Sequence, residues 1–190
     1  MDSDIQAVVV GIWVIAALVW LVSAFAVKRT ERRQSPRSQT THVLLLVLAS
    51  VLMFDGHLNI GPLNNRFVPY SELIQYLGLF LTFAGIAFAI WARFLIGRNW
   101  SATVMVKRDH QLIRGGPYAI VRHPIYSGFL LAFFGTALET GEYRALLGLA
   151  VAFYGWRMKS LMEERFMSEQ FGPAYSDYKR RVKALIPFVW

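Results

Sequence analysis

Five stretches of mostly apolar residues follow one another along the chain, and charged segments separate them. The first stretch has no charged side chain over 23 positions. As a helix that rises about 1.5 Å per residue, it is long enough to cross a hydrocarbon core of roughly 30 Å. The stretches are residues 5–27, 38–54, 73–92, 123–138 and 145–156. This pattern predicts an all-α integral membrane protein with about five transmembrane helices.

The connection between the last two stretches is short and polar, and it contains Gly141. Connections of this length join neighbouring antiparallel helices, so we expect these two stretches to form a helical hairpin. A different loop, residues 55–70, carries Asp55, His57 and Asn59, which are residue types that can bind a metal. Its glycines, proline and paired asparagines favour a plain turn-rich loop instead, and we expect no metal.

The composition agrees with a membrane protein. Hydrophobic residues make up 55% of the 190 residues, which is more than a soluble domain of this size usually carries. Such a composition argues against intrinsic disorder and against a nucleic-acid-binding module. The sequence has no cysteine, which excludes a disulfide scaffold, cysteine-based metal sites and a thiol nucleophile.

The basic residues are distributed unevenly between the two sides of the predicted bundle. If the N-terminus lies outside, 18 of the 20 Lys and Arg residues fall on inner segments, and only Arg66 and Arg144 fall outside. Inner loops of membrane proteins are enriched in Lys and Arg, so the pattern predicts an outer N-terminus and an inner C-terminus. We therefore attribute the net charge of +8 to topology and lipid headgroups, and expect no nucleic-acid partner.

The segment at residues 97–128 holds the first group of candidate functional residues. Pro124 suits the first position of the fourth helix, because its missing N–H would have no intrahelical partner there. His123 is then the N-cap residue, with Arg122 just outside the helix. Free N–H groups and the positive end of the helix dipole make this a natural site for a carboxylate or phosphate. Simple anchoring of both side chains at the membrane interface is an equal alternative.

A second group follows the fifth stretch. On a helix, Lys159 and Glu163 share one face, and Ser160 and Glu164 share another. Lys before Glu is the weaker order for helix stabilisation, so helix support explains the pair poorly. These side chains either reach the membrane surface as solvated charges or line a polar cavity at the mouth of the bundle.

The C-terminal tail shows a helical pattern of its own. Aromatic and aliphatic residues recur at helical spacing, and basic residues occupy the opposite face. The positions are Tyr175, Tyr178, Val182 and Leu185. The tail is expected to form an amphipathic helix that lies either on the inner membrane surface or over the site.

Four short motifs occur in one order on the predicted inner face. An HxL motif at His110 precedes Tyr118, and an RHPxYxG motif runs over residues 122–128. An EE pair at residues 163–164 and an FGxxYxxYxxxV motif at residues 171–182 follow, before a terminal Ile-Pro. Together they resemble the isoprenylcysteine carboxyl methyltransferase family, over roughly residues 97–188. Phospholipid N-methyltransferases, from the same wider group, are similar at RHPxYxG and EE.

The resemblance implies S-adenosyl-L-methionine as the cofactor, bound in a cytosolic loop region at the inner ends of the last helices. The family's cofactor-binding positions, with Arg122 added for its charge toward the donor's carboxylate, are His110, Gln111, Leu112, Ile113, Tyr118, Arg122, His123, Pro124, Ile125, Tyr126 and Glu163. Where the family has a substrate-contacting Arg, this sequence has Lys159, and Arg157 could substitute for it. Lys159, Arg157 and Glu164 are therefore the candidate catalytic residues.

These implications predict one membrane-embedded methyltransferase domain over residues 1–190. Residues 1–96 would hold three N-terminal spans, and residues 97–190 the cofactor-binding and catalytic half. The predicted reaction is methyl transfer to a lipophilic or lipid acceptor, of the isoprenylcysteine-carboxylate type. The alternatives are a phospholipid amine N-methyltransferase, a sterol reductase that uses a nicotinamide cofactor, and a non-enzymatic membrane scaffold. A bacterial or archaeal cell membrane is expected, with the active site at the cytoplasmic face.

Overall fold

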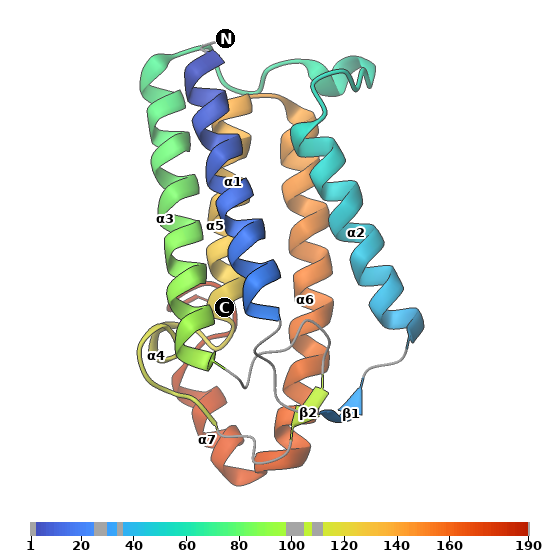
Figure 1. Cartoon of the computed structure of the whole chain (residues 1–190), viewed down its shortest axis with the longest axis vertical. Helices are drawn as coiled ribbons and strands as arrows, with labels where there is room; N and C mark the ends of the chain where they lie inside the picture. The colour runs from blue at the N-terminus through green and yellow to red at the C-terminus, as the bar shows by residue number, and fades with distance from the viewer. Residues whose placement is uncertain (1–2, 25–29, 34–35, 98–104, 108–111, 190) are drawn as a thin grey trace.

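The computed structural model of the chain describes residues 3–24, 30–33, 36–97, 105–107 and 112–189. Over these residues the protein is almost entirely helical (Figure 1). The five long helices are α1 (Ser3–Ala24), α2 (Pro36–Phe54), α3 (Glu72–Ile96), α5 (Pro124–Thr140) and α6 (Tyr143–Phe171). The short elements are a 3₁₀ turn η1 (Gly61–Asn64), α4 (Pro117–Ile120), α7 (Pro173–Arg181), and the antiparallel strands β1 (Thr30–Arg33) and β2 (Met105–Lys107).

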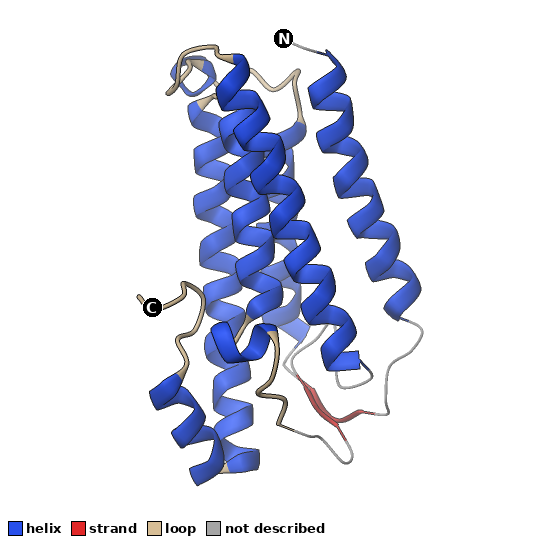
Figure 2. Cartoon of the chain, turned by 90° about the vertical axis from the view of Figure 1, so that its left-hand side faces the viewer, coloured by secondary structure: helices blue, strands red, loops and turns tan. Residues whose placement is uncertain are grey.

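The short elements divide between the two ends of the helix bundle. Figures 1 and 2 show α4, α7 and the two strands at one end, called the site end below. The N-terminus and the loop that contains η1 lie at the opposite end. Helices α3 and α6 therefore both end at the site end, as the sequence pattern predicts.

Two helices are long and apolar enough to cross a membrane, at Asp4–Ser23 and Glu72–Ile96. A shorter apolar helix occupies Ser38–Phe54. Among the described residues, α5 and α6 do not meet the same test by themselves. Helix α5 has only 17 residues, and the apolar part of α6 continues without a break into a charged segment that ends at Phe171. The predicted stretch 145–156 and the group of charged residues that follows it thus belong to one helix.

The predicted hairpin of the last two long helices is confirmed. Gly141 ends α5 in the left-handed conformation, with φ at 74°, and its N–H donates to the carbonyl of Ala137 at 2.8 Å. This conformation is costly for residues with a Cβ, so glycine suits the turn. Helix α6 begins two residues later at Tyr143. The antiparallel arrangement returns the end of α6 to the site end, beside the start of α5.

Glycines allow α3 and α5 to pack with their backbones in contact. A Cβ atom on Gly135 would lie 2.5 Å from the backbone nitrogen of Thr82 and 2.6 Å from the carbonyl oxygen of Gly78. Small residues permit this close approach between membrane helices. Hydroxyl groups add polar contacts there, because Thr82 Oγ1 lies 3.2 Å from Thr136 Oγ1. The indole N–H of Trp13 also donates to Thr136 Oγ1, at 3.0 Å, which ties α1 to this pair.

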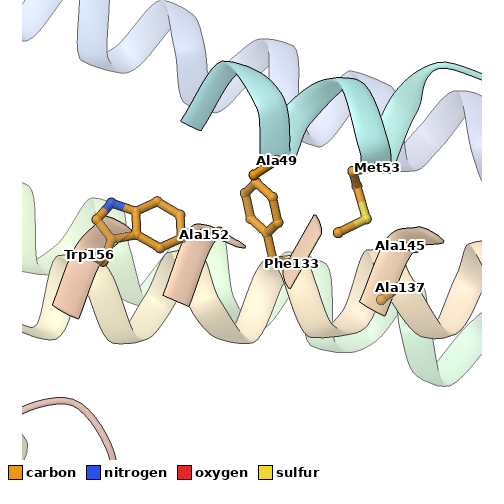
Figure 3. Packing of buried hydrophobic residues seen from close by; sticks show 7 residues of the cluster. All are labelled: Ala49, Met53, Phe133, Ala137, Ala145, Ala152 and Trp156. Carbon is orange, nitrogen blue, oxygen red and sulfur yellow. The ribbon is translucent and has the colours of Figure 1, made fainter. Parts of the chain in front are cut away.

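Helices α2, α5 and α6 share a buried apolar cluster (Figure 3). Its members are Ala49, Met53, Phe133, Ala137, Ala145, Ala152 and Trp156. The alanines keep the helices close, while the rings of Phe133 and Trp156 fill the space between them, edge to face at 5.5 Å. This cluster holds α6 in place just before its charged segment begins.

The loop at residues 55–70 uses its polar side chains to build turns. The carboxylate of Asp55 accepts the N–H of His57 at 2.9 Å, and the side-chain oxygen of Asn59 accepts the N–H of Gly61 at 3.1 Å. Buried Arg144 closes the same end of the bundle, with bonds to Glu142 and to the carbonyl of Leu52 at 2.5 and 2.9 Å. The loop is turn-rich, as its sequence predicts.

Candidate methyl-transfer site

The start of α5 has the predicted form. His123 is the N-cap residue and Pro124 is the first helical residue. Both side chains are buried, and His123 is only 8% exposed. Because α6 returns beside α5, this point faces the charged segment of α6.

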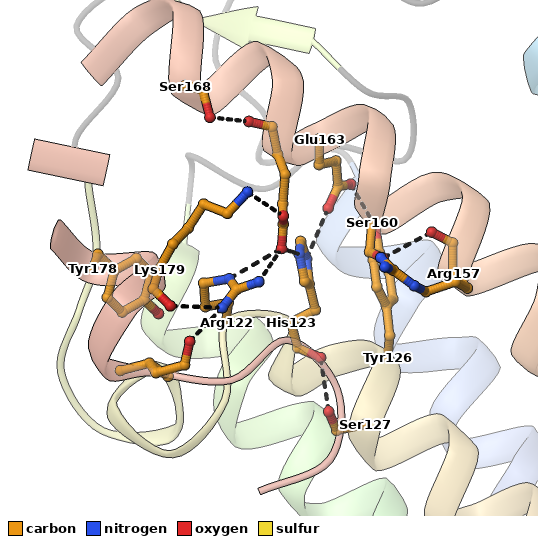
Figure 4. Close-up of polar contacts among 12 residues, drawn as sticks. Arg122, His123, Tyr126, Ser127, Arg157, Ser160, Glu163, Ser168, Tyr178 and Lys179 are labelled. Carbon is orange, nitrogen blue, oxygen red and sulfur yellow. Dashed lines mark hydrogen bonds and ion pairs between the residues drawn. The ribbon is translucent and has the colours of Figure 1, made fainter. Parts of the chain in front are cut away.

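His123 lies between the two carboxylates of α6 (Figure 4). Its Nδ1 is 3.3 Å from Glu163 Oε2, and its Nε2 is 3.3 Å from Glu164 Oε1. The hydroxyl of Tyr126, one turn into α5, donates to Glu163 Oε1 at 2.5 Å. One imidazole ring therefore couples the two glutamates, and Glu163 also receives a hydrogen bond from the phenol.

Glu164 is enclosed by basic side chains. Arg122 donates to its Oε1 from Nε at 3.0 Å and from Nη2 at 2.5 Å. Lys179, on α7, binds its Oε2 at 2.9 Å. The side chain of Glu164 is 8% exposed, whereas that of Glu163 is 26% exposed. Of the two carboxylates, Glu163 is therefore the one that a ligand can reach.

The surroundings keep both carboxylates ionised. Burial would raise the pKa of Glu163, but hydrogen bonding to His123, the charges of His123 and Lys159, and the bond from Tyr126 outweigh it and lower that pKa. The pKa of Glu164 lies well below its usual range. Burial alone would raise this pKa, but hydrogen bonds from His123, Lys179 and Arg122 outweigh the effect of burial. Both carboxylates are thus ionised at neutral pH, and Glu164 is already paired with Arg122 and Lys179.

The tail passes from α7 across the start of α5. The hydroxyl of Tyr178 donates to the carbonyl of Tyr118 at 2.5 Å. Burial raises the pKa of Tyr178 to about 12, so its hydroxyl stays protonated and available as a donor. Lys183 and Ala184 follow α7. Their carbonyls accept hydrogen bonds from the backbone N–H groups of Arg122 and His123, at 2.8 and 3.0 Å.

One sequence-based expectation is corrected here. The tail helix is shorter than its spacing predicts, since α7 ends at Arg181 and Val182 is already extended. Val182 and Leu185 belong instead to the segment that pairs with the start of α5, where Val121 and Lys183 form a parallel bridge. The N–H groups of Arg122 and His123, which precede the first turn of α5, bind the tail. Of the two expected positions, the tail lies over the site.

Aromatic rings continue inward from the carboxylates. The ring of His123 stacks on that of Tyr126, with centroids 5.6 Å apart. Tyr126 in turn lies nearly parallel to Trp156 at 6.4 Å, and Trp156 stacks on Phe129 at 5.5 Å. The ammonium group of Lys159 is 5.7 Å from the centroid of the Tyr126 ring. Flat aromatic faces beside a carboxylate suit a cationic or planar ligand.

Residues 73–174, more than half of the chain, match the sequence model of the family described as phospholipid methyltransferase. The chain belongs to this family. Its site residues at the start of α5 and on α6 lie within the matched region. It is therefore a methyltransferase with membrane character, to which its apolar helices also point.

Three named relatives of this phospholipid methyltransferase family member are methyltransferases as well. Protein-S-isoprenylcysteine O-methyltransferase B of Arabidopsis thaliana is 29% identical over 78% of the chain and 75% of the relative. The rat protein-S-isoprenylcysteine O-methyltransferase is 31% identical over 67% of the chain and 47% of the relative. Methanethiol S-methyltransferase 2 of Bradyrhizobium diazoefficiens is 44% identical over 37% of the chain and 26% of the relative. The chain thus spans less than half of two of these three relatives.

The predicted site residues of this family member fall into four groups. The side chains of Arg122, His123, Tyr126, Lys159, Glu163 and Glu164 come together at the site end. Tyr118 and Ile125 form a buried apolar cluster with Ala92, against which Ile113 packs. Arg157 and Leu112 belong to neither set. Arg157 lies on α6, where its Nη1 is 3.5 Å from Ser160 Oγ. Leu112 is partly buried. His110 and Gln111 lie outside the described residues.

The structure adds residues that the motifs do not single out. Lys179 belongs to the basic face of the tail by sequence, yet it binds Glu164. Trp156 ends an apolar stretch and stacks on Tyr126. His42, on α2, places Nδ1 3.2 Å from the carbonyl oxygen of Gly155 on α6. A histidine in an apolar helix was the one sequence signal that could have drawn attention to α2.

Proposed function

We propose that this protein transfers a methyl group from S-adenosyl-L-methionine to a lipophilic acceptor at the site end of the bundle. The observation that carries this proposal is the Glu163 carboxylate. It is the more exposed of the two carboxylates, and His123 and Tyr126 hold it in place. It also lies within the region that matches the methyltransferase family.

The residues at the site fit the charges of this cofactor, which supplies an electrophilic methyl group on a sulfonium. Glu163 is suited to bind a cationic part of the cofactor, because it is ionised and accessible. The rings of His123, Tyr126 and Trp156 stack on one another inward of this carboxylate. Arg122 is already bound to Glu164 and to tail carbonyls, so we assign it to holding the tail over the start of α5.

Lys159 is suited to the acceptor side. It precedes Glu163 by one helical turn, and its ammonium lies over the Tyr126 ring. A cation at this place attracts a carboxylate acceptor and repels an ammonium group. This favours an acceptor of the isoprenylcysteine-carboxylate type, as the names of the Arabidopsis and rat relatives also suggest, over a phospholipid amine. Catalysis then consists mainly of aligning acceptor, methyl group and sulfur in a water-poor site.

We further propose that all five long helices span the membrane, with the site end toward the cytoplasm. The reason is that 18 of the 20 basic residues fall on the inner segments that the sequence predicts. The fifth span is the apolar first part of α6, up to Trp156, so the carboxylates lie beyond it. A lipophilic acceptor could then reach the site from within the bilayer.

Calorimetric titration of the purified protein with S-adenosyl-L-methionine, and with NADPH as the control, tests the cofactor. We expect binding of the first and none of the second. Methyl transfer to a farnesylated thiopropionic acid then tests the carboxylate acceptor. Binding of NADPH instead would indicate a reductase, and failure to bind either would indicate a non-enzymatic role. Each of these results contradicts the proposal.

A further inference from the structure

Beyond α7, the tail runs back along the start of α5 toward the middle of the bundle. The carbonyl of Ala184 accepts the N–H of His123 at 3.0 Å, and the carbonyl of Leu185 accepts the hydroxyl of Ser127 at 2.6 Å, one turn further into the helix. Figure 1 shows the C-terminus nearer the middle of the bundle than α7. In the proposed orientation, this direction leads from the cytoplasm into the bilayer.

The described part of the tail finishes in a turn made of apolar residues, Ile186 to Val189, called the tail turn below. The N–H of Val189 donates to the carbonyl of Ile186 at 3.3 Å. Pro187 and Phe188 occupy the two central positions, and Phe188 has a positive φ of 64°, a conformation that bulky residues rarely adopt. Turns that face water favour Gly, Asn, Asp and Ser, so this composition indicates an apolar environment.

The tail turn projects away from the protein. Phe188 is 90% exposed and Val189 is 72% exposed, so neither side chain is buried against the bundle. Other exposed aromatic side chains, such as Phe80 and Phe94, lie on α3, where the bilayer would surround them. The exposed ring of Phe188 is placed to enter the bilayer in the same way.

Basic side chains with no acidic partner lie at the end of α7 and just beyond it. Between residues 173 and 190 the sequence holds four basic residues and one acidic residue. Lys179 and Arg180 pair with acidic side chains. Arg181 and Lys183 are exposed, and neither forms an ion pair within the part of the chain that the structure describes. Their charges are available to an anion outside the protein.

We propose that the tail binds the anionic phospholipids of the cytoplasmic leaflet, with the tail turn among the acyl chains and Arg181 and Lys183 at the phosphate groups. Apolar side chains that enter the bilayer beside basic ones are the arrangement of an interfacial anchor. Each Lys or Arg near an anionic surface strengthens such binding by about fivefold. This inference rests on the proposed function, because it uses the proposed orientation of the bundle.

The lipid contact also acts on the site, because the tail turn continues from residues that bind beside the carboxylates. Residues 183–185 bind the start of α5. Arg122 donates both to the carbonyl of Val182 and to Glu164. A tail held in the leaflet keeps Arg122 and His123 beside the carboxylates, and its release loosens them.

Fluorescence quenching by lipids tests the insertion. Phe188→Cys in the full chain carries a nitrobenzoxadiazole label, in vesicles of equal parts phosphatidylcholine and phosphatidylglycerol, and no native cysteine competes for the label. We expect a nitroxide on the lipid acyl chains to quench this label strongly. Ser176→Cys, exposed on α7, is the matched control and should stay unquenched. An unquenched label at position 188 would contradict the insertion.

A change of charge tests the anionic partner. In the labelled protein, Arg181→Gln combined with Lys183→Gln should lower the ratio of inserted to free tail by about 30-fold in the mixed vesicles. Vesicles of phosphatidylcholine alone should lower it in the same way. Arg165→Gln, which removes an exposed charge from α6, is the matched control and should leave the ratio unchanged. Equal quenching in both kinds of vesicle would contradict binding to anionic lipid.

Cofactor affinity tests the effect on the site. Phe188→Asp puts a charge on the tail turn, and in mixed vesicles we expect it to weaken S-adenosyl-L-methionine binding several-fold. Ser176→Asp adds the same charge on α7 and should leave the affinity as in the wild type. Because both variants are measured in one lipid, attraction of the cationic cofactor to the vesicle surface cancels. Equal affinities would contradict the effect on the site.

A label at Phe83→Cys, on the exposed face of α3, distinguishes this inference from the proposed function. Quenching at position 83 but not at position 188 contradicts the lipid anchor alone. No quenching at either position contradicts the membrane-spanning bundle, and the inference with it. Wild-type protein that binds no S-adenosyl-L-methionine contradicts the proposed reaction, whatever the tail does.

Discussion

His123 contacts a different carboxylate with each of its ring nitrogens. The two glutamates differ in their other contacts and in their exposure. Glu163 stays partly exposed, with the phenol of Tyr126 as its second partner. Glu164 is buried among Arg122 and Lys179. Neighbouring residues of one type therefore have different surroundings, because they point about 100° apart on α6.

The first prediction separates the cofactor side of the site from the acceptor side. Glu163→Gln should weaken S-adenosyl-L-methionine binding by about 2 kcal/mol, or roughly 30-fold, as a charge-assisted contact is lost. Lys159→Ala should lower turnover with a carboxylate acceptor and leave cofactor affinity nearly unchanged. Calorimetry and methyl-transfer rates on both variants check this. Wild-type behaviour of both would show that neither side chain acts on the cofactor or the acceptor.

The second prediction concerns Glu164 and pH. Its pKa is depressed in the folded protein relative to the value of about 4.3 expected for an unfolded chain. The resulting stabilisation is complete above that value and is lost as the pH falls below it toward the folded pKa. Glu164→Gln should therefore be less stable than the wild type at neutral pH, and the gap should shrink in acid.

Thermal unfolding in detergent micelles between neutral pH and about pH 3 measures this gap, over the range in which Glu carboxylates titrate. Glu72→Gln, an exposed position at the start of α3, is the control and should change little. A gap that stays constant across this range would show that the carboxylate at position 164 does not act through its charge.

At the scale of elements, the contact between α3 and α5 is the most demanding part of the fold. Gly135→Ala would bring a Cβ atom to 2.5 Å from backbone nitrogen, so the helices would have to separate. We expect the free energy of unfolding to fall by about 1–3 kcal/mol. Gly11→Ala, where no atom lies within 4 Å of the added Cβ, should be neutral or slightly stabilising. Equal effects in unfolding experiments would contradict this packing.

The course of α6 shows what hydropathy can and cannot predict. The apolar stretch ends at Trp156, but the helix continues to Phe171. The charged part of α6 is rich in good helix formers, so helix propensity could have predicted that the helix continues beyond Trp156. In the tail the opposite occurs, because Val182 and Leu185 keep a helical spacing but lie beyond α7. Pairing with the start of α5 overrides the pattern there.

The main contacts of the site could be predicted from the hairpin. His123 lies 18 residues before Gly141 and Glu163 lies 22 residues after it, so antiparallel helices return them to similar heights. The role of Lys179 could not be predicted in this way. Its position depends on the turn between α6 and α7, where Gly172 has a positive φ of 50°. Spacing along one helix carries no information on the direction of the next.

For the whole molecule, the orientation of the bundle is the central prediction. We expect Ser176→Cys, exposed on α7, to resist an impermeant thiol reagent in intact cells, and Asn59→Cys, exposed at the other end, to be labelled. Because the chain has no native cysteine, each signal comes from one position. Labelling after permeabilisation confirms that both thiols are reactive. The reverse pattern would place the site outside the cell.

Because α6 is one continuous helix, the distances between its site residues are fixed by their spacing in the sequence. Four residues of helix span about 6 Å, so the segment from Gly155 through Lys159 to Glu163 marks two equal intervals along one line. One residue inserted between Lys159 and Glu163 would turn the carboxylate by about 100° and shift it by about 1.5 Å, away from His123. The number of residues between Lys159 and Glu163 therefore sets where the Glu163 carboxylate lies relative to His123.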